Sequence, residues 1–173
     1  MIDKIRLIFK DKCMLLIAIV LVVHCIVSML WLRINTYFYG PDEFSHLLHS
    51  EFLMNNILSD DWLKPFVYFE YRWPPLYFIL VAFVGAIFAN VQIGYFVVNV
   101  FLWIVLLFSV RLISRYLYDD TVSILSLVFM SFCPGLFVYS RFCNLDFALT
   151  AIFCLNWYFL LRSDYFYNKK YTN

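Results

Sequence analysis

The run from Cys13 to Leu32, CMLLIAIVLVVHCIVSMLWL, decides the fold class, because only His24 and Ser28 interrupt its apolar character. At about 1.5 Å of rise per residue, a helix of this length covers the ~30 Å hydrocarbon core of a bilayer. The rest of the chain is similar: 64% of the 173 residues are hydrophobic, 14% are charged, and the mean hydropathy is +0.80. These values exclude a soluble domain and a disordered chain, and they predict an all-α, polytopic membrane protein.

The first run is an uncleaved span. A signal peptide would have a shorter apolar region, about 7–15 residues, and a cleavage site of small residues, which residues 28–32 do not offer. The net charge of +1, without a basic run, gives no reason to expect a nucleic-acid partner. By the positive-inside rule, the basic residues before the span place the N-terminus in the cytoplasm; they are Lys4, Arg6, Lys10 and Lys12.

Three later runs are also long and apolar, and we expect full spans at residues 93–110, 121–140 and 142–161, four with the first. The run at 75–89 has only 15 residues, below the ~17 needed to cross, and is expected to form a half-membrane helix on the outer side. If it crossed fully, the basic residues after it would face outward; if it does not, all basic clusters fall in the cytoplasm. The basic residues in question are Arg111, Arg115, Arg162, Lys169 and Lys170.

The outer loop at residues 33–74 gathers titratable groups directly after a Gly40-Pro41 turn. We expect a helix from Asp42 to about Asn56, with the Asp42 carboxylate as its N-cap. Asp42, His46 and His49 would share one face, with Glu43 beside it. The acids could equally be an ordinary acidic helix N-terminus, and the histidines ordinary packing residues. The opposite face would offer apolar side chains to a membrane surface or a neighbouring helix: Phe44, Leu47, Leu48 and Phe52.

Two further charged residues are candidates. Asp146 is the only carboxylate in the last apolar run, and an ionisable group at membrane depth indicates function by default, although it could cap a helix beside Asn144. Arg72 could bind a phosphate or anchor at the lipid headgroups, and so could Arg141, with Arg72 the preferred binding residue. A divalent metal ion held by Asp42 and Asp146 is a further prediction.

Three stretches in this order resemble the polytopic GT-C glycosyltransferases, with the protein O-mannosyltransferase and lipid A aminoarabinose transferase superfamily as the nearest group. They are Pro41-Asp42-Glu43-Phe44-Ser45-His46 after the first span, Arg72-Trp73-Pro74-Pro75-Leu76-Tyr77-Phe78 before the short helix, and Tyr139-Ser140-Arg141-Phe142-Cys143-Asn144-Leu145-Asp146 before the last span. The resemblance covers nearly the whole chain. Family members often have an Arg-Pro pair before the second acid, where this chain has Cys143-Asn144-Leu145.

The resemblance implies a glycosyltransferase that takes a sugar from a polyprenyl-phosphate donor and passes it to a glycan, lipid or protein hydroxyl on the outer face of the plasma membrane. Asp42 would be the catalytic residue and Glu43 its support, while Arg72, Asp146 and His46 would bind substrate. Members of this superfamily usually have more spans, so we expect this chain to correspond to their N-terminal part, with a C-terminal half or partner subunit elsewhere. The alternative is a non-catalytic membrane subunit or lipid-carrier-binding fragment. A transporter is disfavoured, because the charges gather in outer loops rather than at mid-membrane.

Overall fold

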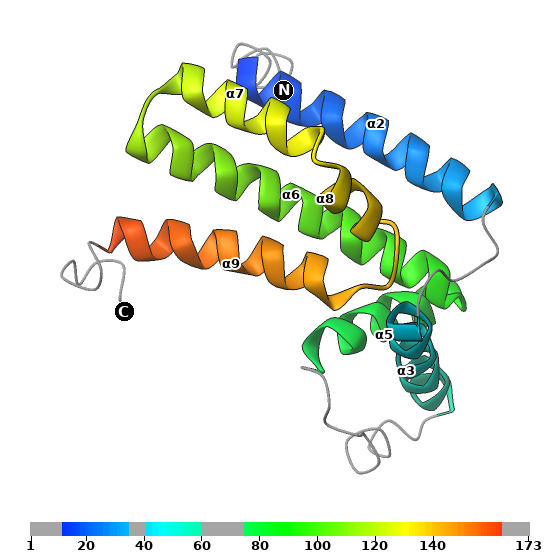
Figure 1. The fold of residues 1–173 in the computed structure, drawn as a ribbon. Coiled ribbons are helices and arrows are strands. Elements are labelled where there is room, and N and C mark those ends of the chain that lie inside the picture. Colours follow the sequence, from blue (N-terminus) through cyan, green and yellow to red (C-terminus); the bar gives the residue numbers. More distant parts are fainter. Residues whose placement is uncertain (1–11, 35–40, 60–74, 164–173) are drawn as a thin grey trace, which may run out of the picture.

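The computed structural model describes residues 12–34, 41–59 and 75–163, and every regular element within these ranges is a helix (Figure 1). This confirms the predicted all-α class. In chain order the helices are α2 (Lys12–Ile34), α3 (Pro41–Leu58), α5 (Leu76–Phe88), α6 (Val91–Leu117), α7 (Asp120–Ser131), α8 (Pro134–Tyr139) and α9 (Leu145–Arg162).

Three of the described helices are long and apolar enough to cross a membrane: Met14–Ile34, Val91–Leu117 and Leu145–Arg162. They correspond to the predicted spans at 13–32, 93–110 and 142–161, and they make this a membrane-embedded protein. The α6 helix continues past the predicted end at residue 110 to Leu117, so it carries Arg111 and Arg115 within its last two turns.

The predicted span at 121–140 is not one continuous helix. The α7 helix ends at Ser131 after 12 residues, Cys133 is extended with φ −67° and ψ 111°, and Pro134 opens the six-residue α8. Proline has no N–H to continue the ladder, and its ring keeps the preceding residue out of the helical region. The structure therefore has three long helices and one interrupted pair where the sequence predicted four full spans.

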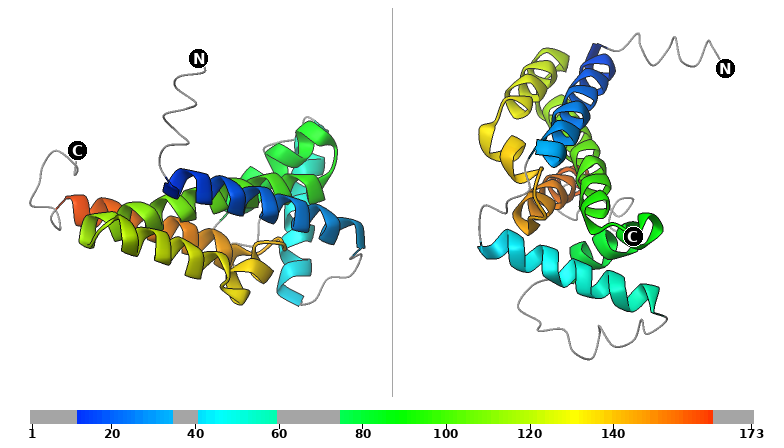
Figure 2. Two further views of the ribbon diagram at one scale, coloured as in Figure 1. Left: turned by 90° about the horizontal axis from the view of Figure 1, so that it is seen from above. Right: turned by 90° about the vertical axis from the view of Figure 1, so that its right-hand side faces the viewer.

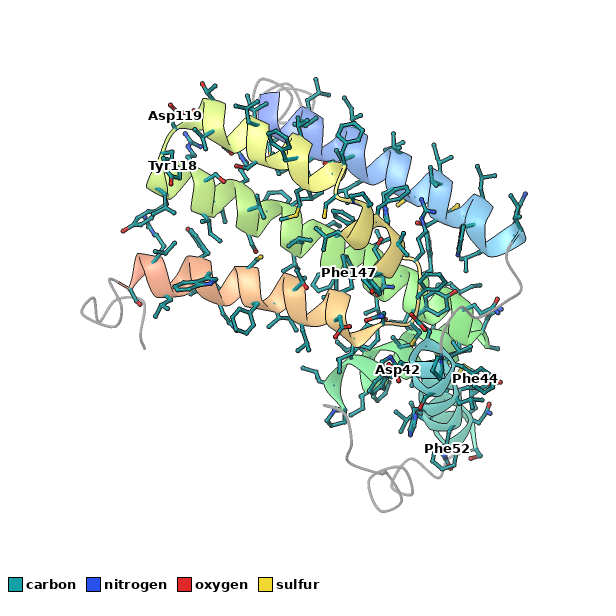
Figure 3. All side chains as sticks on the ribbon, viewed as in Figure 1. Asp42, Phe44, Phe52, Tyr118, Asp119 and Phe147 are labelled. Atoms are coloured by element: carbon teal, nitrogen blue, oxygen red, sulfur yellow. The ribbon has the colours of Figure 1, made fainter. Side chains whose placement is uncertain are left out.

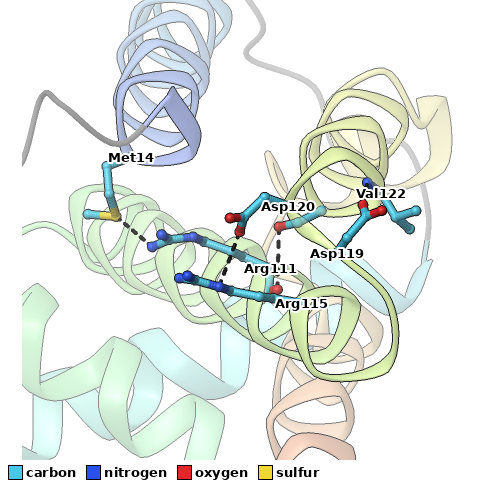
Figure 4. A network of polar contacts seen from close by, with 7 residues as sticks. Met14, Arg111, Arg115, Asp119, Asp120 and Val122 are labelled. Atoms are coloured by element: carbon cyan, nitrogen blue, oxygen red, sulfur yellow. Dashed lines mark hydrogen bonds and ion pairs between the residues drawn. The ribbon is translucent and has the colours of Figure 1, made fainter.

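Side-chain contacts show which helix ends lie together (Figure 4). Arg111 Nη1 lies 3.0 Å from Met14 Sδ, which joins the end of α6 to the start of α2. The Arg162 guanidinium at the end of α9 lies 5.9 Å from the centre of the Tyr116 ring at the end of α6. The Asp119 carboxylate accepts from Val122 N–H and caps the start of α7 at this end. The start of α2 and the ends of α6 and α9 therefore lie at one end of the bundle (Figure 1). The end of α6 carries Arg111 and Arg115 and the end of α9 carries Arg162, whereas Arg33 lies in the last turn of α2, at the opposite end.

The opposite end, called here the α3 end, comprises the end of α2 and the starts of α6 and α9, with α3 and α5 packed against it (Figure 1). The α3 helix is seen nearly end-on in Figure 1 and lengthwise on the right of Figure 2, so it runs across the ends of the long helices. It confirms the helix expected in the loop at 33–74. It begins at Pro41, however, so Asp42 lies inside the first turn rather than at the N-cap.

The α5 helix packs between α3 and the first part of α6. Its 13 residues span about 20 Å, which is less than the hydrocarbon core. Ala89 adopts a left-handed conformation with φ 49° that ends α5, and the Asn90 side chain accepts from the N–H groups of Gln92 and Ile93 to begin α6. Gly94 lets the two helices touch, since a Cβ there would lie 2.4 Å from the Val81 carbonyl oxygen.

Candidate functional site

The two faces of α3 differ in part from the prediction, because some of the polar residues are buried and some of the apolar residues are exposed. Asp42 is exposed and Glu43 half-buried, but His46 is only 4% exposed, with its ring 5.1 Å from that of Phe78 on α5. His49 is half-buried, and its Nδ1 donates to the Ser45 carbonyl at 2.7 Å. Of the predicted face, His46 therefore points into the protein and Asp42 points to its surface. Of the predicted apolar face of α3, Phe44, Leu48 and Phe52 are exposed, while Leu47 is buried.

A hydrogen bond from His46 joins the two acidic segments. Its Nδ1 donates to the Cys143 carbonyl at 3.1 Å, and one turn later the Ser50 hydroxyl lies 3.7 Å from Cys143 Sγ. Asp42 is one helical turn before His46, and Asp146 is three residues after Cys143. The contact therefore brings the segment with Asp42 and the segment with Asp146 together at the α3 end, from parts of the chain 97 residues apart.

A buried asparagine holds the same segment from the other side. Asn99 is 1% exposed, and its Nδ2 donates to the carbonyls of Ser140 at 2.9 Å and Phe142 at 2.8 Å. Its Oδ1 accepts from the Tyr77 hydroxyl at 3.0 Å. Both N–H groups of the Asn99 amide thus hold the connection between α8 and α9, and its oxygen is bonded to Tyr77 on α5. Asn99 was not predicted as a site residue, although a lone asparagine inside the apolar run at 93–110 was a usable signal.

Asp146 lies in the first turn of α9, and its side chain is exposed. The helix is capped by Asn144, whose Oδ1 accepts from the Asp146 N–H at 2.7 Å, so the Asp146 carboxylate is not needed as the cap. It stands instead at one end of an open groove of about 370 Å³ along α9. Apart from Asp146 the groove is lined mainly by apolar residues: Leu149, Thr150, Phe153, Cys154 and Trp157.

Burial also sets the protonation state of the Cys143 thiol, which lies beside this site. Cys143 is 3% exposed, and desolvation raises its pKa to about 12, although hydrogen bonds from Ser50 and Tyr77 act in the opposite direction. The thiol therefore stays protonated near neutral pH and is not a nucleophile there. Figure 3 shows Asp42 at the start of α3, at the end of the bundle where α8 is connected to α9.

Two predicted features are not established by this geometry. Arg72 lies outside the described residues. Within the described part of the chain, no three His, Cys, Asp or Glu side chains converge on one point that could hold a metal ion. Asp42 and Asp146 are both exposed carboxylates that the described residues do not complete into a metal site, so the metal ion stays a prediction and no chemical step is derived through it.

No known protein family, no curated protein and no solved structure matches this chain. The resemblance to GT-C glycosyltransferases therefore rests on the three stretches quoted above, and the function is argued from the site itself.

Proposed function

We propose that this protein is a membrane glycosyltransferase that moves a sugar from a polyprenyl phosphate to the hydroxyl of a glycan, lipid or protein. The observation that carries the proposal is the His46–Cys143 hydrogen bond, which joins the acidic start of α3 to the acidic start of α9 at one end of a membrane bundle. Carboxylates exposed beside lipid-facing helices suit a reaction between a lipid-linked donor and a polar acceptor.

The carboxylates at the α3 end could meet two of the demands of this reaction. A glycosyl phosphate already has a good leaving group, so the protein must position the acceptor hydroxyl, remove its proton and stabilise the departing phosphate. Asp42 is exposed and free to accept that proton, and Glu43 stands next to it in the same turn. Asp146 would orient the acceptor from the facing segment, at the end of the groove along α9 that an apolar chain could enter.

The proposal includes an orientation. The arginines of α6 and α9 lie at the end opposite α3, and the positive-inside rule assigns that end to the cytoplasm. The α3 end, with Asp42 and Asp146, would then face outward across the plasma membrane. A lipid carrier that presents its sugar on the outer leaflet would meet the carboxylates there.

The test is transfer from a panel of radiolabelled polyprenyl-phosphate sugars in membranes that contain the wild type or a variant. We expect Asp42→Asn to lower the rate by on the order of a hundredfold or more, the loss typical of a removed general base. Asp146→Asn should also lower it. The matched control is Glu51→Gln, which neutralises another exposed acid of the same helix, two turns further on, and should transfer at the wild-type rate.

Two results would contradict the proposal. If Asp42→Asn transfers sugar as fast as the wild type, the assignment of the base is wrong. If the wild type binds donors but transfers none of the sugars, the chain is a non-catalytic subunit or lipid-carrier-binding protein.

A further inference from the structure

A second groove lies on the other side of the bundle, between α2, α6, α7 and α8. Its volume is about 200 Å³, and it is lined almost entirely by apolar side chains. On α2 these lining residues extend from Leu16 to His24, about 12 Å along the helix axis. Because α2 and α6 are both long and apolar enough to cross a membrane, we expect the groove between them at the depth of lipid chains. Its other lining residues are Trp103, Val128, Ser131, Phe132 and Phe137.

Phe137 is one of the residues that line this groove, and a cation lies on the same ring. The Arg141 guanidinium carbon is 3.7 Å from the centre of the Phe137 ring and 5.3 Å from that of Trp31. Both aromatic faces attract a cation. Arg141 is therefore held beside the apolar groove, a few residues before the long apolar helix α9 begins.

This cation lacks an acidic partner in the described part of the chain. The Nε and Nη2 atoms of Arg141 are buried and make no hydrogen bond. Burial lowers the pKa of the guanidinium from its usual value, yet an arginine stays charged at neutral pH. A buried donor without a partner is costly, and more so when it is charged. Nε and Nη2 form one edge of the planar group, the edge that matches two oxygens of a phosphate.

We infer that the groove and Arg141 together form a binding site for a lipid phosphate, with the chain in the groove and the phosphate on the Nε–Nη2 edge. Arg141 is only partly buried, so rotation about its side-chain bonds can present this edge to a headgroup. Trp31 and Phe137 keep the cation beside the groove, which ties recognition of the phosphate to the presence of a chain. This inference rests on the proposed function, because the sugar donor proposed there is itself a lipid phosphate and would be a ligand of this site.

The experiment measures binding without sugar transfer. Purified protein in detergent is titrated with hexadecyl phosphate, and bound lipid is read by native mass spectrometry. Hexaethylene glycol monohexadecyl ether carries the same chain with a neutral headgroup that has no phosphate, and glycerol 3-phosphate carries the phosphate without a chain. We expect hexadecyl phosphate to bind the wild type roughly tenfold to a hundredfold more tightly than the neutral hexadecyl ether, as for hydrogen bonds to a charged group. Glycerol 3-phosphate should not compete.

Variants separate the cation from the groove. Arg141→Gln should lose the preference for the phosphate headgroup, while Arg141→Lys, which keeps the charge but not the planar edge, should retain part of it. Val128→Phe, which fills the groove, should weaken binding of both lipids. The matched control is Arg162→Gln, because Arg162 also lies near an aromatic ring but at the opposite end of the bundle. It should bind as the wild type does.

The inference is overturned if both hexadecyl lipids bind the wild type equally, if Arg141→Gln keeps the preference, or if glycerol 3-phosphate competes as well as hexadecyl phosphate. Asp42→Asn, in contrast, should bind hexadecyl phosphate normally even when it transfers no sugar. A failure of the proposed transfer reaction and a failure of this lipid site are therefore distinguishable.

Discussion

The contact between α5 and α6 at Gly94 gives a prediction that tests the architecture directly. A Cβ at this position would lie 2.4 Å from the Val81 carbonyl oxygen and 2.8 Å and 2.9 Å from backbone atoms of Gly85. These neighbours are backbone atoms, which cannot turn aside as a flexible side chain would. To restore ordinary contact at about 3.4 Å, Gly94→Ala must move the two helices apart by roughly 1 Å.

The cost of that movement can be estimated. Overpacking a well-packed contact typically costs about 1–3 kcal/mol, whereas alanine is favoured over glycine in a helix by about 1 kcal/mol. Because the clash at Gly94 is with backbone atoms, we expect the upper part of the overpacking range, about 2–3 kcal/mol, so the net loss for Gly94→Ala is about 1–2 kcal/mol. For a chain of this size each kcal/mol corresponds to roughly 2–4 °C in the unfolding midpoint, which predicts a decrease of about 2–8 °C. The displacement should also disturb α3, which packs mainly on α5.

The assay is thermal unfolding of the purified protein in detergent, followed by circular dichroism at a helix band. The matched control is Gly135→Ala in α8, where a Cβ would meet nothing within 4 Å. The same substitution there should leave the midpoint unchanged or raise it. If Gly94→Ala unfolds at the wild-type temperature, or if both variants lose the same stability, the close packing of α5 on α6 is wrong.

Two further predictions concern the connection between α8 and α9. Asn99→Leu leaves the carbonyls of Ser140 and Phe142 and the Tyr77 hydroxyl without their buried partner, so it should cost at least about 2 kcal/mol of stability in the same unfolding assay; a loss below about 0.5 kcal/mol would mean that these hydrogen bonds do not hold the connection. Cys143, as the sole cysteine of a variant, should resist alkylation by iodoacetamide at pH 8. Because burial raises its pKa from 9.0 to about 12, the thiol gains thiolate only as the pH rises toward 12, and labelling of the folded protein at the rate seen after denaturation would refute its burial.

Local sequence chemistry accounts for much of the fold. Apolar runs of 18 residues or more predicted the three long helices, because the bilayer core fixes the length that an apolar helix needs. The acidic residues after Pro41 predicted a helix in the first loop, since proline and carboxylates both favour a helix start. The interruption at Cys133 was also readable from Pro134, but the apolar character of the whole run at 121–140 concealed it.

Tertiary structure decided what the polar residues do. Spacing alone placed His46 on one face with Asp42, yet only the packing of α3 on α5 turns His46 inward to meet a carbonyl 97 residues away. In the same way, Asn99 acquires its role from two carbonyls more than 40 residues downstream, and Arg141 from the aromatic rings of two other helices. Helix formation depends on neighbours along the chain, whereas burial, partners and unmet hydrogen bonds depend on which helices pack together. The sequence by itself therefore determined the membrane class and the long helices, and only the packing determined which polar side chains hold the α3 end together and which stay exposed.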